Sequence, residues 1–251
     1  EAKRPGKLHQ HATMAAMIQS VDEGVGKIIA KLDKLGQRDN TVIFFFSDNG
    51  GYGPATDMAP LWGYKGNYYE GGIRVPFFVN WPGTVKAGQS TAEPIIGVDI
   101  YPTFLDLAKA KRPDQPMDGR SILPVIRGEA KSVGPRPLYW HFPAYLQAYK
   151  VTGEQRDPLF RTRPCSAVRL GDWKLHEYFE DGALELYNLK DDIGERRNLA
   201  KANPAKVKEL HKLLAAWRKE IAAPVPTKPN PDFDAAAEAN AIRKALARRG
   251  E

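Results

Sequence analysis

The sequence predicts an α/β protein whose last part changes to a small antiparallel sheet with a packed helix. Two observations carry this prediction. An amphipathic helix is followed, after a short turn, by a continuous apolar run at residues 42–46, the order of an α/β unit. Beyond about residue 135, short strand-like runs and turn residues take over. We therefore expect an α/β domain part at residues 1–134, an α+β subdomain at 135–222, and a proline-rich linker with a basic helical tail at 223–251.

The first part of the chain opens on the predicted amphipathic helix. Apolar residues recur at spacings of mostly three and four from Met14 to Leu35, and Gly36 supplies a C-terminal stop. The run at residues 42–46 does not alternate, which indicates a strand buried on both faces, as in a parallel sheet covered by helices. Three further elements are expected before residue 134: a strand at 75–80, a helix at 100–110 and a short helical turn at 121–127.

The later part is predicted to be a sheet with a helix packed on it. Strand-like runs cover residues 138–142, 167–179 and 184–189, with a hairpin turn at 180–182 between the last two. Asn203 and Pro204 are typical of a helix start, and an apolar stripe follows them. A second, alanine-rich helix is expected at residues 234–249, where few apolar residues anchor it.

Composition and charge exclude several classes of protein. The 251 residues are 42% hydrophobic, which is too apolar for a disordered chain, and one cysteine excludes internal disulfides and four-cysteine metal sites. No run approaches the roughly 20 apolar residues of a membrane span. The formal charge is +7, but residues 201–251 hold eleven Lys and Arg against six Asp and Glu. Because this surplus lies in a tail without an aromatic-interleaved basic stripe, we expect no nucleic-acid partner.

Two oxygen donors follow the first predicted strand. Asp48 and Asn49 stand at its carboxyl end, which is where open α/β sheets bind ligands. Carboxylate and amide oxygens are hard donors suited to Ca²⁺ or Mg²⁺. An Asp-Asn-Gly sequence is also ordinary in turns, so these residues alone leave both a metal site and a plain turn open.

A glycine- and aromatic-rich segment at residues 63–72 shows no periodicity, which favours a functional loop. Its glycines let the backbone approach a ligand closely, and Lys65 offers a compact charge for an anionic oxygen. Glu70 and Arg74, four residues apart, are expected to brace the loop by pairing with each other. The alternative is a surface loop with an unrelated lysine.

Taken together, these residues resemble the formylglycine-dependent sulfatases of the alkaline-phosphatase superfamily. The resemblance rests on short motifs in the family's order, at residues 47–50, 63–66, 69–76, 81–83, 98–103, 118–121, 171–175, 185–189, 195 and 198–199. It implies that residues 1–134 are the C-terminal part of the sulfatase catalytic α/β domain. It also implies hydrolysis of a sulfate ester, on a carbohydrate or an aryl alcohol.

The resemblance assigns a role to three residues. Asp48 and Asn49 resemble two of the metal ligands, for Ca²⁺ rather than Mg²⁺, and Lys65 resembles the lysine that contacts the substrate sulfate. In such enzymes an aldehyde hydrate made from a cysteine attacks sulfur, and sulfate is then eliminated. Calcium and the lysine stabilise charge on the sulfuryl oxygens. Lys65 is therefore the expected catalytic and substrate-binding residue.

The family's amino-terminal motifs do not occur in this sequence. The formylglycine motif Cys-x-Pro-Ser-Arg and an Asp-Asp metal pair would precede residue 1, so we expect a later half that is inactive without the N-terminal half of the same enzyme. Cys165 begins a Cys-x-Ala-x-Arg sequence that resembles the modified motif. It stands far downstream of Asn49 in a strand-like run, so we expect a half-buried strand cysteine rather than a nucleophile.

The aromatic run that contains His141 is a second candidate contact with substrate. The resemblance implies that such loops border the substrate pocket, so His141 is expected to bind substrate. Tyr145, Tyr149 and Arg163 share this variable region and are further candidates for contact with the leaving group. His9 and His11 are expected to be polar residues at the start of the first helix, and His176 and His211 to be exposed or half-exposed positions on a strand and a helix.

Two other functions stay open. A phosphate or phosphonate ester hydrolase of the same superfamily shares the fold, although such sites generally use two zinc or manganese ions with histidine ligands. A non-catalytic carbohydrate-binding module would keep a sugar-facing surface without turnover. Members of the family are commonly exported, so we expect a periplasmic or secreted protein.

Overall fold

A computed structural model describes residues 11–148 and 156–247, so His9 and Tyr149 lie outside the described residues. The chain forms two compact units. Unit 1 comprises Glu1–Asp48 and Val75–Arg136, and unit 2 comprises Asn49–Arg74 and Pro137–Glu251. The sequence suggested one change of architecture near residue 135. The structure adds that the glycine-rich segment Asn49–Arg74 belongs with the C-terminal part.

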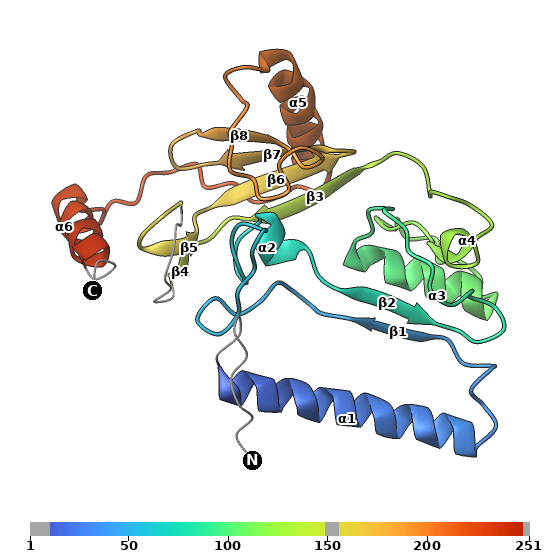
Figure 1. The fold of residues 1–251 in the computed structure, drawn as a ribbon. Helices are drawn as coiled ribbons and strands as arrows, with labels where there is room; N and C mark the ends of the chain where they lie inside the picture. Colours follow the sequence, from blue (N-terminus) through green and yellow to red (C-terminus); the bar gives the residue numbers. More distant parts are fainter. Residues whose placement is uncertain (1–10, 149–155, 248–251) are drawn as a thin grey trace. The chain divides into compact units, whose positions relative to one another are not determined.

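Unit 1 holds the helices and strands that the sequence predicts for the first part of the chain. They are α1 (Ala12–Lys34), β1 (Ile43–Phe46), β2 (Phe77–Asn80), the 3-10 turn η1 (Gly97–Asp99), α3 (Ile100–Ala108) and α4 (Leu123–Ile126) (Figure 1). His11 caps α1, because its Nδ1 accepts the Met14 N–H at 3.1 Å. The structure thus confirms the helices and strands that were predicted here, with small differences at their ends.

The pairing of β1 differs from the prediction. β1 and β2 run antiparallel, with Phe44 opposite Val79. Phe45, Phe46 and Phe78 are 42%, 43% and 63% exposed, so the run is not covered on both faces by the described residues. The expectation of a parallel strand buried on both faces was therefore wrong. A continuous apolar run indicates that both faces of a strand are apolar, but it does not show the direction of the neighbouring strand.

Asp99 organises the loops of unit 1. Its fully buried carboxylate accepts the N–H groups of Ile96 and Arg120, both at 2.9 Å, and pairs with the Arg136 guanidinium. The Asp99 carbonyl accepts the Thr103 hydroxyl at 2.6 Å. The motifs at residues 98–103 and 118–121 therefore meet at one buried carboxylate, whose contacts are structural.

Unit 2 is built on a four-stranded antiparallel sheet of order β3-β6-β7-β8 (Figure 1). The strands are β3 (Pro137–Phe142), β6 (Cys165–Leu170), β7 (Trp173–Tyr178) and β8 (Leu184–Asn188). The single run predicted at 167–179 is in fact two strands, because Gly171 turns the chain with φ +58°. The hairpin predicted at 180–182 is confirmed. The short strands β4 (Leu146–Gln147) and β5 (Phe160–Thr162) pair separately.

One face of this sheet, here called the apolar face, packs against α5 (Pro204–Glu220). Because side chains alternate along a strand, Val168, Leu175 and Leu186 point to this face. They meet Leu210 and Leu214 of α5, and all five side chains are fully buried in one core. The amphipathic stripe predicted after Asn203 is therefore confirmed as the helix that covers the sheet.

The opposite face, here called the polar face, carries ionisable and aromatic side chains. Its members are Cys165, Arg169, Lys174, His176, Tyr178, Glu185 and Tyr187. Contacts from residues 62–72, including the short helix α2 (Glu70–Ile73), cover them. The sheet thus holds its core on one side and the glycine-rich segment on the other.

The alanine-rich helix α6 (Ala235–Ala247) is anchored by charge rather than by a core. Glu238 Oε1 lies 2.9 Å from Arg163 Nη2, and Arg163 also pairs with Asp157 and Glu180. No helix among residues 11–148 and 156–247 is long and apolar enough to cross a membrane.

Candidate functional site

Three glycine-rich stretches of unit 2 are joined by backbone hydrogen bonds. The Lys65 N–H donates to the Gly51 carbonyl at 2.9 Å, and the Gly50 N–H donates to the Gly72 carbonyl at 2.9 Å. The Gly71 N–H donates to the Trp62 carbonyl at 2.7 Å. Residues 49–51, 62–66 and 69–72, which are separate motifs in the sequence, therefore form one loop cluster.

This loop cluster is packed backbone against backbone. A Cβ atom on Gly50 would overlap the Gly71 carbonyl oxygen, and one on Gly71 would overlap the Gly63 carbonyl oxygen. Neither obstacle is a flexible side chain, so no substitution fits without moving the backbone. The glycines of the motifs are thus explained by close approach, which gives the loop cluster a fixed shape.

Lys65 stands out from this packed surface. Its side chain is exposed, whereas Tyr64 and Asn67 beside it are buried. Gly66 follows with φ +102°, which only glycine adopts readily, so the turn at Lys65 is fixed on both sides. Arg161 of β5 reaches the same turn and donates from Nη1 to the Lys65 carbonyl at 3.5 Å. The arrangement presents one ammonium group on a rigid backbone.

Asp48 and Asn49 form a bend after β1. Asp48 is exposed, Asn49 is half-buried, and the division between the two units falls at the bond that joins them. Their oxygens have the chemistry of ligands for a hard cation such as Ca²⁺, which takes about six to eight. Within the described ranges no group of three or more His, Cys, Asp or Glu could hold a metal ion. The donor chemistry of each residue suits Ca²⁺, and a calcium site at this bend stays a prediction.

A cluster of buried charges lies between the loop cluster and the polar face. Lys174 Nζ is 2.9 Å from Glu70 Oε1 and 3.0 Å from Glu195 Oε1, and His176 Nε2 is 3.1 Å from the same Glu195 oxygen. All four side chains are at most 2% exposed. Burial alone would raise the pKa of Glu195, but the charge of Lys174 and the His176 hydrogen bond hold that pKa below its usual value.

Only part of this cluster was predicted from the sequence. Glu70 and Arg74 were expected to pair with each other, and they do so at 3.5 Å, yet the shorter contact of Glu70 is with Lys174. His176 was expected to be exposed or half-exposed, and that was wrong, because its side chain is fully buried against the Tyr69 ring. The signal that could have found it is its spacing of two from Lys174, which puts both on one face of β7.

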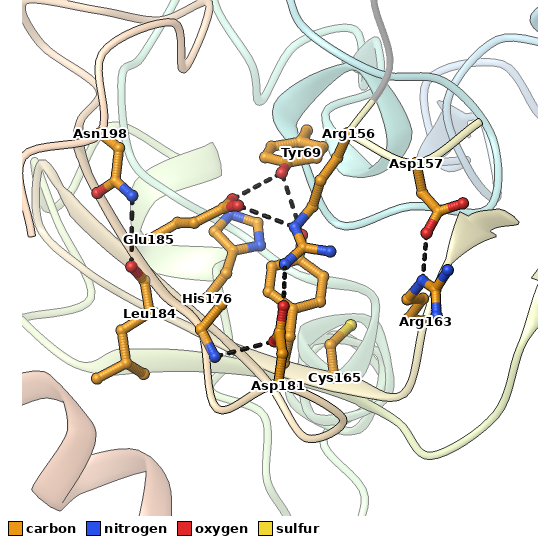
Figure 2. A network of polar contacts seen from close by, with 12 residues as sticks. Tyr69, Arg156, Asp157, Arg163, Cys165, His176, Asp181, Leu184, Glu185 and Asn198 are labelled. Carbon is orange, nitrogen blue, oxygen red and sulfur yellow. Dashed lines mark hydrogen bonds and ion pairs between the residues drawn. The ribbon is translucent and has the colours of Figure 1, made fainter. Parts of the chain in front are cut away.

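A second network beside this cluster joins aromatic hydroxyls to one carboxylate. Tyr69 and Arg156 both point at Glu185 in Figure 2, with Tyr69 Oη 2.6 Å from Glu185 Oε2 and Arg156 Nε 3.0 Å from Oε1. The Tyr178 hydroxyl donates to the Tyr69 oxygen at 3.1 Å. Burial raises the pKa of Tyr69 and of Tyr178 well above the usual value, so both are neutral at physiological pH. Tyr69 is thereby fixed to the sheet directly before Glu70.

His141 lies on the opposite side of the sheet from Lys65. It stands opposite Ser166 in the β3–β6 pair, so it points to the apolar face, where its ring meets Trp217 of α5. Its Nδ1 is 2.8 Å from the Ser166 hydroxyl and its Nε2 is 2.8 Å from the Pro224 carbonyl. The structure therefore does not bring His141 together with Lys65, and the predicted contact with substrate has no support from these bonds.

Cys165 is the first residue of β6 and is 1% exposed. Burial raises the pKa of its thiol to about 11, so the reactive thiolate is scarce at neutral pH. The expectation of a strand cysteine rather than a nucleophile agrees with this environment, although the residue is more deeply buried than expected. Its Sγ lies 3.4 Å from the Thr162 hydroxyl, and Figure 2 shows it beside the network of Tyr69 and Arg156.

The other candidates for contact with the leaving group have separate surroundings. Tyr145 is exposed and its ring packs on Phe160 at a centroid distance of 5.0 Å. Arg163 is enclosed by Asp157, Glu180 and Glu238. The contacts of Arg163 therefore anchor unit 2 internally.

Two sequence families match the chain. The family described as sulfatase matches residues 1–110, and the family described as N-sulphoglucosamine sulphohydrolase, C-terminal, matches residues 61–220. The second match alone covers more than half of the chain. The chain belongs to the sulfatase family. The fold of this sulfatase chain is accordingly alkaline-phosphatase-like α/β, with antiparallel sheets among the residues described.

Individual relatives are considerably longer than this sulfatase chain. A sulfatase of Formosa agariphila is 34% identical over 232 residues, which cover 83% of this chain and 40% of the relative. The solved structure of Ps i-CgsB in complex with k-i-k-neocarrahexaose is 29% identical with a TM-score of 0.68, and the likeness covers 95% of this chain and 48% of that one. The phosphonate monoester hydrolase SpPMH of Silicibacter pomeroyi is 27% identical with a TM-score of 0.60, over 80% of this chain and 39% of that one.

Proposed function

We propose that this chain supplies the later part of an enzyme that hydrolyses a sulfate ester of a carbohydrate. The observation that carries the proposal is the exposed ammonium group of Lys65 on a backbone that three motifs hold rigid. The sulfatase family and the oligosaccharide named with Ps i-CgsB support the reaction class and the kind of substrate. An aryl sulfate is the second substrate class, and it would use the same lysine.

Lys65 has a defined task in this proposal. Its ammonium group binds a sulfuryl oxygen of the ester and stabilises the negative charge that grows on the sulfate as the ester bond breaks. A charge fixed in advance does this without reorganisation during the reaction, which is the use of the rigid turn. Arg161 holds the Lys65 carbonyl and so limits movement of the turn.

Asp48 and Asn49 would hold part of a calcium site in the same enzyme. Their side-chain oxygens are suitable donors, and further ligands would have to come from residues other than these two. A bound Ca²⁺ supplies positive charge beside the sulfuryl oxygens. The formylglycine expected from the resemblance would likewise come from another part of the enzyme.

We further propose that unit 1 packs against the N-terminal half of the same enzyme. The helix α1 buries none of its residues, and its apolar stripe, with Met17, Ile18, Val21 and Ile28 more than half exposed, has no cover within the described part of unit 1. Exposed apolar stripes of this length mark interfaces. This chain spans 40% of the sulfatase of Formosa agariphila. The remaining part of such an enzyme is the partner that we propose for the exposed stripe of α1. A periplasmic or secreted location stays a prediction.

A sulfate-ester assay tests the proposed reaction. The 251 residues are assayed with a chromogenic aryl sulfate and a sulfated oligosaccharide, alone and joined to the N-terminal half of a sulfatase. We expect turnover only in the joined protein, lost on calcium chelation and reduced at least about 100-fold in Lys65→Met, because a preorganised charge of this kind contributes that much. Lys212→Met, an exposed lysine on α5, is the control and leaves turnover unchanged.

The assay also separates the alternatives. Calcium-dependent turnover by the 251 residues alone, lost in Lys65→Met, would contradict the need for an N-terminal half. Faster turnover of a phosphonate ester than of a sulfate ester by the joined protein would favour the hydrolase class of SpPMH. Calorimetric binding of the sulfated oligosaccharide without turnover in any form would identify a binding module.

A further inference from the structure

The buried charges of unit 2 reach the loop cluster through one short helix. The Glu195 carboxylate accepts the backbone N–H of Glu70, the first residue of α2, with an N···O distance of 2.5 Å. The Glu70 side chain pairs with Lys174 of β7. Glu70 is therefore bound through its backbone by Glu195, in the loop after the C-terminal sheet, and through its side chain by Lys174 of that sheet.

From Glu70 a series of backbone bonds leads to Lys65. The next two residues of α2 are Gly71 and Gly72. The Gly71 N–H donates to the Trp62 carbonyl, and the Gly72 carbonyl accepts the Gly50 N–H. The Lys65 N–H then donates to Gly51. Because the nearest neighbours of Gly50, Gly71 and Gly72 are backbone atoms, a shift of α2 meets few soft side chains that could absorb it. Displacement of α2 is therefore passed on to the turn.

The buried charges are costly if their task is stability alone. Two carboxylates and an ammonium group, none more than 2% exposed, lose their hydration, and apolar side chains of similar size are often as stable in such a place. What such a cluster does better than apolar packing is to accept a single arrangement, since each hydrogen bond has one partner and one direction. None of the three side chains can touch a substrate, because all are enclosed.

We propose that Lys174, Glu70 and Glu195 form a positioning cluster that fixes the Lys65 ammonium group for contact with the sulfate ester. The inference rests on the proposed function, since Lys65 acts there on the substrate. Tyr69 adds a second hold next to Glu70 through Glu185 on the polar face (Figure 2). The three residues act through Lys65 and take no part in the chemistry themselves.

Hydrogen exchange on the 251-residue chain tests the positioning without any activity. Lys174→Met removes the ammonium group, and Glu195→Gln keeps an acceptor for the Glu70 N–H while removing the charge, so it serves if Lys174→Met does not fold. We expect exchange of the amides of Lys65, Gly71 and Gly72 to speed up at least about tenfold more than exchange of the amides of β6 and β7, which report the change in global stability. Lys206→Met, which removes a surface pair with Glu209, is the control.

Kinetics in the joined sulfatase test the action through Lys65. A displaced charge should lower kcat/KM by about tenfold to a hundredfold in Lys174→Met or Glu195→Gln. In a Lys65→Met background the same changes should have almost no further effect on kcat/KM, whereas effects that multiply would indicate general damage to the fold.

The two measurements distinguish the failure of each proposal. Unchanged exchange at Lys65, Gly71 and Gly72 in a folded Glu195→Gln variant overturns the positioning cluster, as do effects on kcat/KM that multiply with Lys65→Met. If the joined protein turns over no sulfate ester, or Lys65→Met turns it over normally, the proposed function fails. In that case faster exchange in the variants still establishes that the buried charges fix the turn at Lys65. Unchanged exchange would refute the positioning cluster as well.

Discussion

Both faces of the β3-β6-β7-β8 sheet bury side chains, but one face buries aliphatic groups and the other buries charged and aromatic groups. The apolar face meets α5 through Val168, Leu175 and Leu186, where one aliphatic side chain can replace another at modest cost. The polar face meets the glycine-rich segment through Lys174 and His176, where each group has a specific partner. The comparison shows one sheet that gains stability on one side and fixes a loop on the other.

The largest effect is expected from unbalancing the polar face. Lys174→Met leaves the carboxylates of Glu70 and Glu195 buried without their shared cation, which should cost about 3–5 kcal/mol of the free energy of unfolding. Combining it with Glu195→Gln should recover part of this loss, because one of the two negative charges is removed with the cation. Urea unfolding of the 251-residue chain measures both. A double variant that is less stable than Lys174→Met would contradict the electrostatic origin of the cost.

A cavity in the apolar face should cost slightly less. Leu214→Ala removes a fully buried side chain from the core and should lower the free energy of unfolding by about 2–5 kcal/mol. Unlike the change at Lys174, it should leave exchange at the Lys65 turn unchanged relative to the rest of the sheet. Leu246→Ala on α6, which is half exposed, is the matched control and should stay within about 0.5 kcal/mol. Selective opening of the turn by Leu214→Ala would erase the distinction between the faces.

The smallest effect is the share of the pH dependence of stability that comes from Glu195 beside the polar face. The pKa of Glu195 lies below its usual value in the folded chain, so its charge stabilises the fold above about pH 4.3, the ordinary value, and this contribution is lost as the pH falls through the lowered pKa. Melting temperatures between pH 3 and pH 7 should therefore fall less steeply in Glu195→Gln than in the parent. Leu214→Ala should keep the parent's slope, and equal slopes in all three chains would contradict the assignment to Glu195.

The sequence predicts the apolar face well and the polar face poorly, for a physical reason. Helix α5 and its strands are readable because aliphatic periodicity is local and its cause, burial, is the same at each position. Lys174 and Glu70 stand 104 positions apart, and each by itself looks like a solvent-facing charge. Only the fold brings them together, so a pattern of single residues cannot show that they are buried.

The candidate site divides in the same way. Lys65, Asp48 and Asn49 could be selected from glycine-rich motifs and from the resemblance to sulfatases, because those motifs are short and continuous. His141 was selected from its aromatic neighbours, which are equally typical of the packing it makes with Trp217 of α5. Its side of the sheet depends on the β3–β6 register, which composition does not contain.

The position of Cys165 has a consequence for the order of events after synthesis. Its Cys-x-Ala-x-Arg sequence lies in β6, whose two edges are both occupied, by β3 and by β7. A modifying enzyme that reads such a sequence as an extended segment needs a free backbone and an accessible thiol. Both exist only while the chain is unfolded, so closure of the sheet ends the interval in which this cysteine could be mistaken for a substrate.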